Sequence, residues 1–181
     1  MKKFLIPSLL VLITALGSCT REELDDPTDM SVNFIRSDRQ IATNSYAKKD
    51  LTFAAKKLNN ELLVVVFGQY DRLEFRVPAV SAHINGIYPI KNATGTGDVA
   101  VSYRYVGTHA GLAVESDRDT NQDLIEGVLV INNYNAERNT ATCSFSVNIK
   151  DTKDPRVRNA DPVTDKTNVA INGTIREIRL N

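Results

Sequence analysis

The sequence predicts an all-β domain, folded as an antiparallel sandwich or barrel of about nine strands. Apolar and polar residues alternate with a period of two, as in 72–79 and 98–106, which is typical of half-buried strands. Turn-forming residues separate such segments, among them Asn85-Gly86 and Gly95-Thr96-Gly97. No stretch of about ten residues or more carries the apolar stripe of an amphipathic helix.

These patterns locate the individual strands. We expect strands at 50–57, 61–68, 72–79, 86–91, 98–106, 109–115, 126–134, 139–149 and 167–180, with a further one at 31–36. The segment 45–57 is the best competing helix, because Ala47, Ala54 and Ala55 are helix formers. Its apolar positions do not close one face, which favours the strand.

Two details of the strands can be predicted. The apolar residues of 167–180 change from odd to even positions, so we expect a β-bulge near Arg176-Glu177. Continuous apolar runs at 62–67 and 128–131 indicate strands that are covered on both faces.

The composition narrows the class of protein. The chain of 181 residues is 42% hydrophobic, which is enough apolar surface for a folded core and too much for a disordered chain. Its 22 basic residues are balanced by 22 acidic ones. A nucleic-acid partner is therefore not expected, since phosphate contacts require a clustered basic surface.

The N-terminus predicts secretion and lipid anchoring. Residues 1–18 read as a signal peptide, since two lysines precede an apolar stretch that is too short to cross a bilayer core of about 30 Å. Leu16-Gly17-Ser18-Cys19 resembles the bacterial lipobox, so Cys19 is expected to carry the lipid (palmitate among its acyl chains) and to begin the mature protein. An acidic tether at 19–30 and one all-β domain at 31–181 follow. The expected location is the cell envelope, lipid-anchored to the outer membrane, on its periplasmic or its outer surface.

A lipidated Cys19 leaves the second cysteine, Cys143, without a disulfide partner. Cys143 shares one face of a period-two pattern with Phe145, Val147 and Ile149, so we expect a buried small hydrophobic side chain rather than a reactive thiol.

Four segments together resemble a family of small Bacteroidetes-type lipoproteins of unknown function. They are Gly86-Ile87-Tyr88-Pro89-Ile90, Gly127 to Asn135, Cys143 to Val147, and Val169 to Ile175. In that family the corresponding strands read G-x-Y, G-x-(V/L)-x-I-x-x-Y-(D/N), F-S-F and V-x-I-x-x-G-x-F, over most of the mature chain. This sequence has Cys143 and Ile175 where the pattern has Gly and Phe. The resemblance implies an all-β lipoprotein domain and no particular chemistry.

Catalytic motifs are scarce in the sequence. The two histidines, His83 and His109, both lie beside turns without a metal-ligand partner at helical or strand spacing. An envelope enzyme that uses His83 or His109 with a nearby carboxylate stays an alternative. The Gly95-Thr96-Gly97 segment is read as a turn, because no helix follows it that could hold a phosphate.

One acidic segment resembles the start of a calcium-binding loop. Oxygen-bearing side chains alternate at Asp117, Asp119, Asn121 and Asp123, as they do where a loop wraps a hard cation. Gln122 replaces the glycine of such loops, and a solvated turn is the competing interpretation. Calcium is the only cofactor that the sequence suggests.

Loop lengths indicate where binding takes place. In an up-and-down sheet, the connections alternate between the two ends of the sheet. One end is then expected to hold 58–60, 80–85, 107–108 and 135–138, and the other to hold 69–71, 92–97, 116–125 and 150–166. The second group holds the longest polar loops, and long loops on a rigid scaffold commonly carry binding residues. The binding residues expected from these loops are Asn92, Thr94, Thr96, Arg118, Asn121, Lys153, Arg156 and Arg158.

The function predicted is a non-catalytic binding or scaffold module of the cell envelope, with its binding loops at the end of the domain that points away from the membrane. Its partner is expected to be a protein or a glycan. A carbohydrate-recognition module is a further alternative, in which exposed tyrosines stack on sugar rings. Tyr46, Tyr70 and Tyr134 are the candidates for exposure, whereas Tyr103 and Tyr105 are expected in the core.

Overall fold

The fold is an all-β sandwich of two antiparallel sheets. The structure is a computed structural model that describes residues 29–35, 40–58, 61–78, 84–90, 98–109, 112–120, 122–153 and 166–180. The predicted fold class is confirmed, and of its two forms the sandwich is correct, because the sheets do not close into a barrel. In the described part, the only helical element is the 3₁₀ turn η1 (Lys48–Asp50), so no helix there is long enough to cross a membrane.

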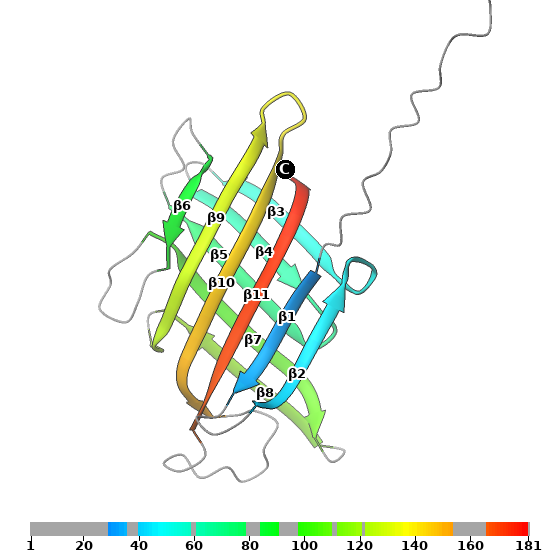
Figure 1. Cartoon of the computed structure of the whole chain (residues 1–181), viewed down its shortest axis with the longest axis vertical. Coiled ribbons are helices and arrows are strands. Elements are labelled where there is room, and N and C mark those ends of the chain that lie inside the picture. Colours follow the sequence, from blue (N-terminus) through cyan, green and yellow to red (C-terminus); the bar gives the residue numbers. More distant parts are fainter. Residues whose placement is uncertain are drawn as a thin grey trace, which may run out of the picture.

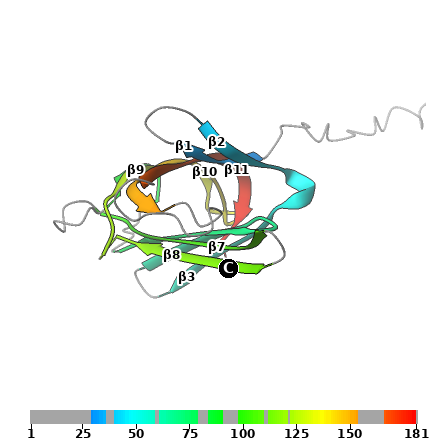
Figure 2. The ribbon, with the colours of Figure 1, turned by 90° about the horizontal axis from the view of Figure 1, so that it is seen from below.

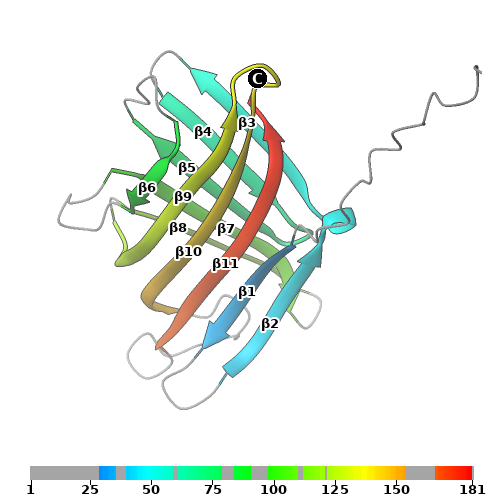
Figure 3. The same ribbon diagram turned by 45° about the horizontal axis from the view of Figure 1, so that its top comes forward.

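The first sheet, sheet A, has six strands in the order β2-β1-β11-β10-β9-β6. Figure 3 shows these strands side by side, with β10 and β11 near the middle. Their bounds are β1 (Asp29–Ile35), β2 (Gln40–Ala47), β6 (Gly86–Pro89), β9 (Ile125–Asn135), β10 (Thr140–Lys153) and β11 (Lys166–Arg179).

The second sheet, sheet B, has five strands in the order β3-β4-β5-β7-β8. Their bounds are β3 (Thr52–Leu58), β4 (Glu61–Phe67), β5 (Asp71–Val77), β7 (Ala100–His109) and β8 (Leu112–Asp119). The strands of sheet B run across those of sheet A in Figure 1, and Figure 2 shows the two sheets as two layers. Side chains from the inner faces of both sheets form one apolar core, in which Phe75 of β5 packs on Phe145 of β10 with ring centroids 5.2 Å apart.

Most predicted strands are present, but β2 was missed. The sequence of β2 reads Gln-Ile-Ala-Thr-Asn-Ser-Tyr-Ala, in which Asn44 and Tyr46 alternate with Thr43 and Ser45. Asn44 and Tyr46 face inward, because they pair with Val32 and Met30 of β1, which are buried. Because these inward positions are polar, the segment does not show the alternation of apolar and polar residues that predicts a strand. The competing helix at 45–57 is wrong, since this segment is the end of β2, η1 and β3.

The predicted β-bulge is confirmed. Between the pairs Cys143↔Ile175 and Ala141↔Ile178, β10 advances by two residues and β11 by three. The extra residue lies at Arg176-Glu177, and Glu177 has a φ of 49°. The two apolar runs are covered on one face and only partly on the other: Leu63 and Phe67 of β4, and Val128 and Val130 of β9, are half-buried.

The predicted up-and-down order is wrong, and β6 is the reason. Strict alternation would make β5 and β7 parallel, but they are antiparallel neighbours, with Asp71 opposite Tyr105. The intervening β6 leaves sheet B and pairs with β9 in sheet A. The 68–70 turn therefore lies at the same end of sheet B as the end of β7, not at the opposite one.

Two of the predicted loops are also shorter than expected. Residues 116–119 belong to β8, Ile125 to β9, 150–153 to β10 and Lys166 to β11, so the loops 116–125 and 150–166 begin later and end earlier than predicted. The domain starts slightly earlier, because Asp29 and Met30 are part of β1 and Met30 is buried.

We name the two ends of sheet A by what lies there. At the loop end, β1 ends at Ile35, β9 begins at Ile125, and β10 is joined to β11. At the hairpin end, residues 136–139 connect β9 to β10. The chain enters β1 on the side of the hairpin end, because Asp29 pairs with Thr174 of β11 whereas Ile35 pairs with Asn168. Six residues of strand separate these pairs, or about 20 Å.

Candidate functional site

The described ends of the three long connections lie together at the loop end. The Lys150 amide donates to the Leu124 carbonyl over 2.9 Å, and Lys153 pairs with Lys166, which brings the 120–124 and β10–β11 connections side by side. The Ile90 amide donates to the Gly127 carbonyl over 3.0 Å, near the start of β9. The predicted grouping of these three connections thus agrees with the described strand ends, although the alternation argument behind it was wrong.

Most of the predicted binding residues lie outside the described part of the chain. They are Asn92, Thr94, Thr96, Asn121, Arg156 and Arg158, together with the side chain of Lys153. The same holds for Cys19 and the whole of 1–28, for His83, and for the side chain of His109. These assignments stay predictions.

Arg118 is the predicted binding residue that the structure places in detail. It lies on β8 opposite Tyr103 of β7, so its side chain faces the space between the sheets. Its Nε donates to Thr152 Oγ1 of β10 over 2.6 Å, and one terminal nitrogen lies 3.7 Å from Asp123 Oδ1. The side chain is 28% exposed. We refer to Arg118, Asp123 and Thr152 as the loop-end cluster.

Buried threonines support the loop-end cluster. Thr152, Thr120 and Thr167 are all less than 6% exposed. The Thr120 hydroxyl accepts from the Val101 amide over 3.2 Å, and the Thr167 hydroxyl donates to the Ile35 carbonyl over 2.7 Å. The cluster therefore joins the edge of sheet B to the loop end of sheet A, with an arginine at its open side.

The residues predicted to bind calcium are divided between a strand and a turn. Asp117 and Asp119 are on β8, and Asp117 Oδ1 lies 3.6 Å from Nε of Arg104 on the outer face of sheet B. Asp123 Oδ2 accepts from the Asp119 amide over 2.9 Å. Within the described ranges no group of three or more His, Cys, Asp or Glu residues is placed to hold a metal ion. Asn121 lies outside those ranges, and the calcium site stays a prediction.

A second polar cluster was not predicted from the sequence. Asp71, at the start of β5, is 3% exposed and accepts three hydrogen bonds. Tyr103 Oη donates to Oδ1 over 2.6 Å, Asn44 Nδ2 donates to Oδ2 over 3.1 Å, and Tyr46 Oη donates to Oδ2 in a short contact. We call Asn44, Tyr46, Asp71 and Tyr103 the carboxylate cluster. It ties β2 of sheet A to β5 and β7 of sheet B.

Burial and the carboxylate together change the acidity of the two phenols. Desolvation raises the pKa of Tyr46 above its ordinary value, and its hydrogen bond to Asp71 raises it further. The pKa of Tyr103 is raised in the same way, with burial the larger cause and the charge of Asp71 the next. Both phenols therefore stay protonated and remain hydrogen-bond donors to the carboxylate at neutral pH.

Gly68 explains how Tyr46 fits into this cluster. A side chain on Gly68 would place its first carbon 2.6 Å from Tyr46 Cζ, so only glycine allows the ring to lie against the β4–β5 turn. Tyr46 is 6% exposed, and its predicted exposure is wrong. The predictions for Tyr70, which is 39% exposed, and for Tyr103 and Tyr105, which are buried, are confirmed. Counting back two residues from the apolar Leu73 places Asp71 on the inward face of the strand. This alternation is the feature of the sequence from which a buried carboxylate could have been predicted.

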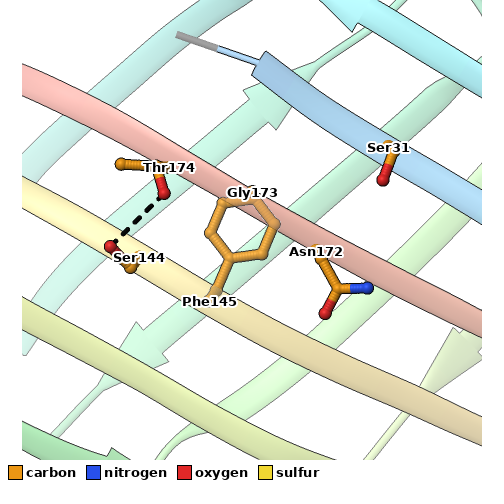
Figure 4. Close-up of a pocket in the computed structure, with 6 residues that line it drawn as sticks. All are labelled: Ser31, Ser144, Phe145, Asn172, Gly173 and Thr174. Carbon is orange, nitrogen blue, oxygen red and sulfur yellow. Dashed lines mark hydrogen bonds between the residues drawn. The ribbon is translucent and has the colours of Figure 1, made fainter.

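The outer face of sheet A carries an open hollow of about 370 Å³. It is lined by Ser31 of β1, by Ser144 and Phe145 of β10, and by Asn172, Gly173 and Thr174 of β11, as Figure 4 shows. The Phe145 ring lies against Gly173, where a side-chain carbon would come within 2.9 Å of ring atom Cε2. The polar side chains at this hollow are Ser, Thr and Asn.

Cys143 is a buried small side chain, as predicted. It is free and fully buried in β10, and burial raises the pKa of its thiol to about 12. Cys143 pairs directly with Ile175 of β11.

Comparison with known protein families, with curated protein sequences and with solved structures finds no match to this chain.

Proposed function

We propose that this protein is a non-catalytic, lipid-anchored binding module of the cell envelope, which meets its partner at the loop end. Cys19 carries the anchor, and the residues up to 28 form the tether. The direction of β1 is the observation that supports the proposal most. The chain begins β1 at Asp29, on the side of the hairpin end, and reaches the loop end only at Ile35. A tether attached there leaves the loop end directed away from the membrane.

The loop-end cluster supplies the chemistry of this contact. The guanidinium of Arg118 is held through Nε by the buried Thr152, and one of its terminal nitrogens lies 3.7 Å from Asp123 Oδ1, in the 120–124 connection. A guanidinium presented in this way recognises carboxylate or phosphate groups by paired hydrogen bonds. The partner therefore offers an acidic group to Arg118, and the neighbouring loops add the remaining contacts.

The anchor is tested by metabolic labelling. A palmitate analogue is expected to label the wild-type protein, and Cys19→Ala is expected to remove the label and release the protein from the membrane fraction. A Cys19→Ala protein that stays in the membrane, together with an unlabelled wild type, would rule out the anchor.

The orientation is tested by crosslinking from the two ends of sheet A in intact cells. Gln122 at the loop end and Glu137 at the hairpin end are both exposed, so a photo-reactive amino acid can replace either one. We expect a specific adduct from position 122 and none from position 137. The reverse result would place the partner at the hairpin end.

The β10–β11 loop is tested by shortening it. Lys153 and Lys166 form a pair, so replacing 154–165 with Asn-Gly gives a two-residue hairpin. Thr152 must be kept, because it is buried and bonded to Arg118. The melting temperature is expected to change little while the adduct from position 122 is lost. A variant that keeps the adduct shows that this loop does not contribute to binding.

A further inference from the structure

Apart from Asp29, which begins β1 opposite Thr174, the outer face of sheet A has no charged residue over its described central part. The side chains that point outward from four adjacent strands are Thr43, Ser45, Ser31, Asn168, Ala170, Asn172, Thr174, Thr140, Thr142, Ser144, Ser146 and Asn148. These twelve residues are small and, with one exception, polar. A surface of ordinary composition would have about three or four charged residues among twelve. We call this surface the neutral face.

Charged residues mark the limits of the neutral face. At the loop end, Lys150 Nζ pairs with Glu126 Oε2 over 2.5 Å. Toward the hairpin end, Arg176, Glu177 and Arg179 are exposed beyond the last neutral residue of β11. The absence of charge is thus confined to the face and does not extend along the whole strands.

The outer face of sheet B shows that the protein as a whole does not avoid charge. There, Glu74 bridges Arg72 and Arg76 over 2.8 and 2.7 Å. Arg104 contacts Glu115 and Asp117 on the next strand. The two faces are built from strands of the same domain, so the difference between them is a property of sheet A.

The hollow lies within the neutral face and has unused hydrogen-bonding groups. Thr174 Oγ1 donates to Ser144 Oγ over 3.4 Å, which is a long bond. In the part of the chain that the structure describes, the Ser31 hydroxyl and the Asn172 amide bond to no other side chain. Figure 4 shows these groups on three neighbouring strands around Gly173. Hydroxyl and amide groups both donate and accept hydrogen bonds.

We propose that the neutral face binds an uncharged glycan, with one sugar unit seated in the hollow. A sugar ring carries hydroxyls that donate and accept, which matches a grid of Ser, Thr and Asn side chains about 4.8 Å apart between strands. The volume of the hollow lies within the range of small-molecule sites, at about 300–1,000 Å³. This surface is distinct from the loop end, so the proposal goes beyond the function given above.

Other classes of ligand fit this face less well. A negatively charged ligand would find no counter-charge among the twelve residues, and the charged residue beside them, Asp29, has the same sign as the ligand. A protein partner would need an apolar centre with exposed aromatic residues. Here the one aromatic ring at the hollow, Phe145, is 5% exposed, and the apolar side chains beside the face, Val128, Val130 and Ile87, are aliphatic and lie at its β9 margin. An added peptide strand pairs with a sheet edge, whereas the hollow lies over β1, β10 and β11 in the middle of the sheet.

The test is affinity electrophoresis of the full mature chain in native gels that contain a non-ionic detergent. The gels contain dextran, mannan or galactan as neutral polymers, or polygalacturonate as a charged one. We expect at least one neutral polymer to retard the wild type and polygalacturonate not to do so. Ser144→Lys, which fills the hollow and adds a charge, is expected to weaken the retardation by about tenfold or more. Asn172→Ala removes one amide and is expected to weaken it less.

Ser102→Lys is the matched control. Ser102 is exposed on a central strand of sheet B, so this variant adds the same charge to the other outer face and should bind as the wild type does. The proposal is overturned if no neutral polymer retards the wild type, if only the charged polymer does, or if Ser144→Lys and Ser102→Lys bind equally. Sedimentation of the wild type and Ser144→Lys adds a further check, because a dimer that only Ser144→Lys disrupts would assign the face to a second copy of the chain.

Discussion

The two polar clusters between the sheets differ in how they are closed. The carboxylate cluster surrounds an anion with neutral donors, and Asp71, Tyr46 and Tyr103 are all less than 7% exposed. The loop-end cluster surrounds a cation with one hydroxyl and a distant carboxylate, and it leaves Arg118 28% exposed. A closed cluster stabilises the fold, because each buried group would be costly without its partner. An open cluster has hydrogen-bonding capacity left for a ligand.

Asp71→Ala tests the closed cluster and has the largest expected effect. It leaves two buried phenols and one amide without their acceptor, and we expect the free energy of unfolding to fall by about 3 kcal/mol. Urea denaturation followed by circular dichroism measures the loss. Asp71→Asn keeps one carbonyl acceptor and is expected to lose less. A loss below about 1 kcal/mol for Asp71→Ala would show that this cluster does not hold the sheets together.

The pH dependence of stability separates the clusters further. The pKa values of Tyr46 and Tyr103 are raised in the folded protein, so the folded state holds their protons above pH 10 while the unfolded state releases them. Their contribution is therefore complete below about pH 10, the ordinary tyrosine pKa, and is lost as the pH rises above it. The slope is at most about 1.4 kcal/mol per pH unit for each tyrosine.

Tyrosinate absorbance, measured together with circular dichroism, checks this prediction. Two tyrosines of the wild type are expected to ionise only as the protein unfolds. Tyr46→Phe should reduce the alkaline loss of stability, and Tyr134→Phe, at a half-exposed position outside the cluster, should leave it unchanged. Complete ionisation of all six tyrosines before unfolding would contradict it.

The difference between the clusters also explains what the sequence could predict. Strands such as β5 and β9 were predicted because one face of each meets the apolar core, which produces a visible alternation. Strand β2 was not, because Asn44 and Tyr46 face inward toward Asp71, which lies 25 or more residues further along the chain. Period two can identify an apolar face, but it cannot identify a polar face whose partner is on another sheet.

The same limit applies to the candidate sites. The charged segment around Arg118 predicts it as a binding residue, and Arg118 does lie at the loop end. Its partner Thr152 falls in a predicted loop, since a β-strand that contains Lys150, Asp151 and Lys153 has no apolar alternation. Asp151 has a φ of 52°, and the register between β10 and β11 shifts there. The neutral face could not be predicted from the sequence, because it exists only when strands distant in sequence are placed side by side.

Arg118→Gln tests the open cluster. Because the guanidinium is partly exposed and its contact with Asp123 is long, we expect the free energy of unfolding to fall by about 1 kcal/mol or less. The crosslinked adduct from position 122 is expected to be lost at the same time, since the partner's acidic group loses its cation. Urea denaturation and the crosslinking assay, carried out on the same variant, measure the two effects. A loss as large as that of Asp71→Ala, or an unchanged adduct, would place Arg118 among the structural residues.

The smallest expected effect is the coupling between Arg118 and Thr152. Thr152→Val keeps the shape of the buried side chain and removes the oxygen that accepts from Arg118 Nε. In a double-mutant cycle with Arg118→Gln, we expect a coupling energy of at most about 1 kcal/mol, because water can reach the guanidinium and replace the bond. The matching cycle of Asp71→Asn with Tyr103→Phe is expected to give about twice that value, since water does not reach the 2.6 Å bond between two side chains that are both nearly fully buried. Both cycles are measured by urea denaturation. Equal coupling energies would mean that partial exposure does not weaken the loop-end cluster, and Arg118 would then lack the free capacity that binding at this end requires.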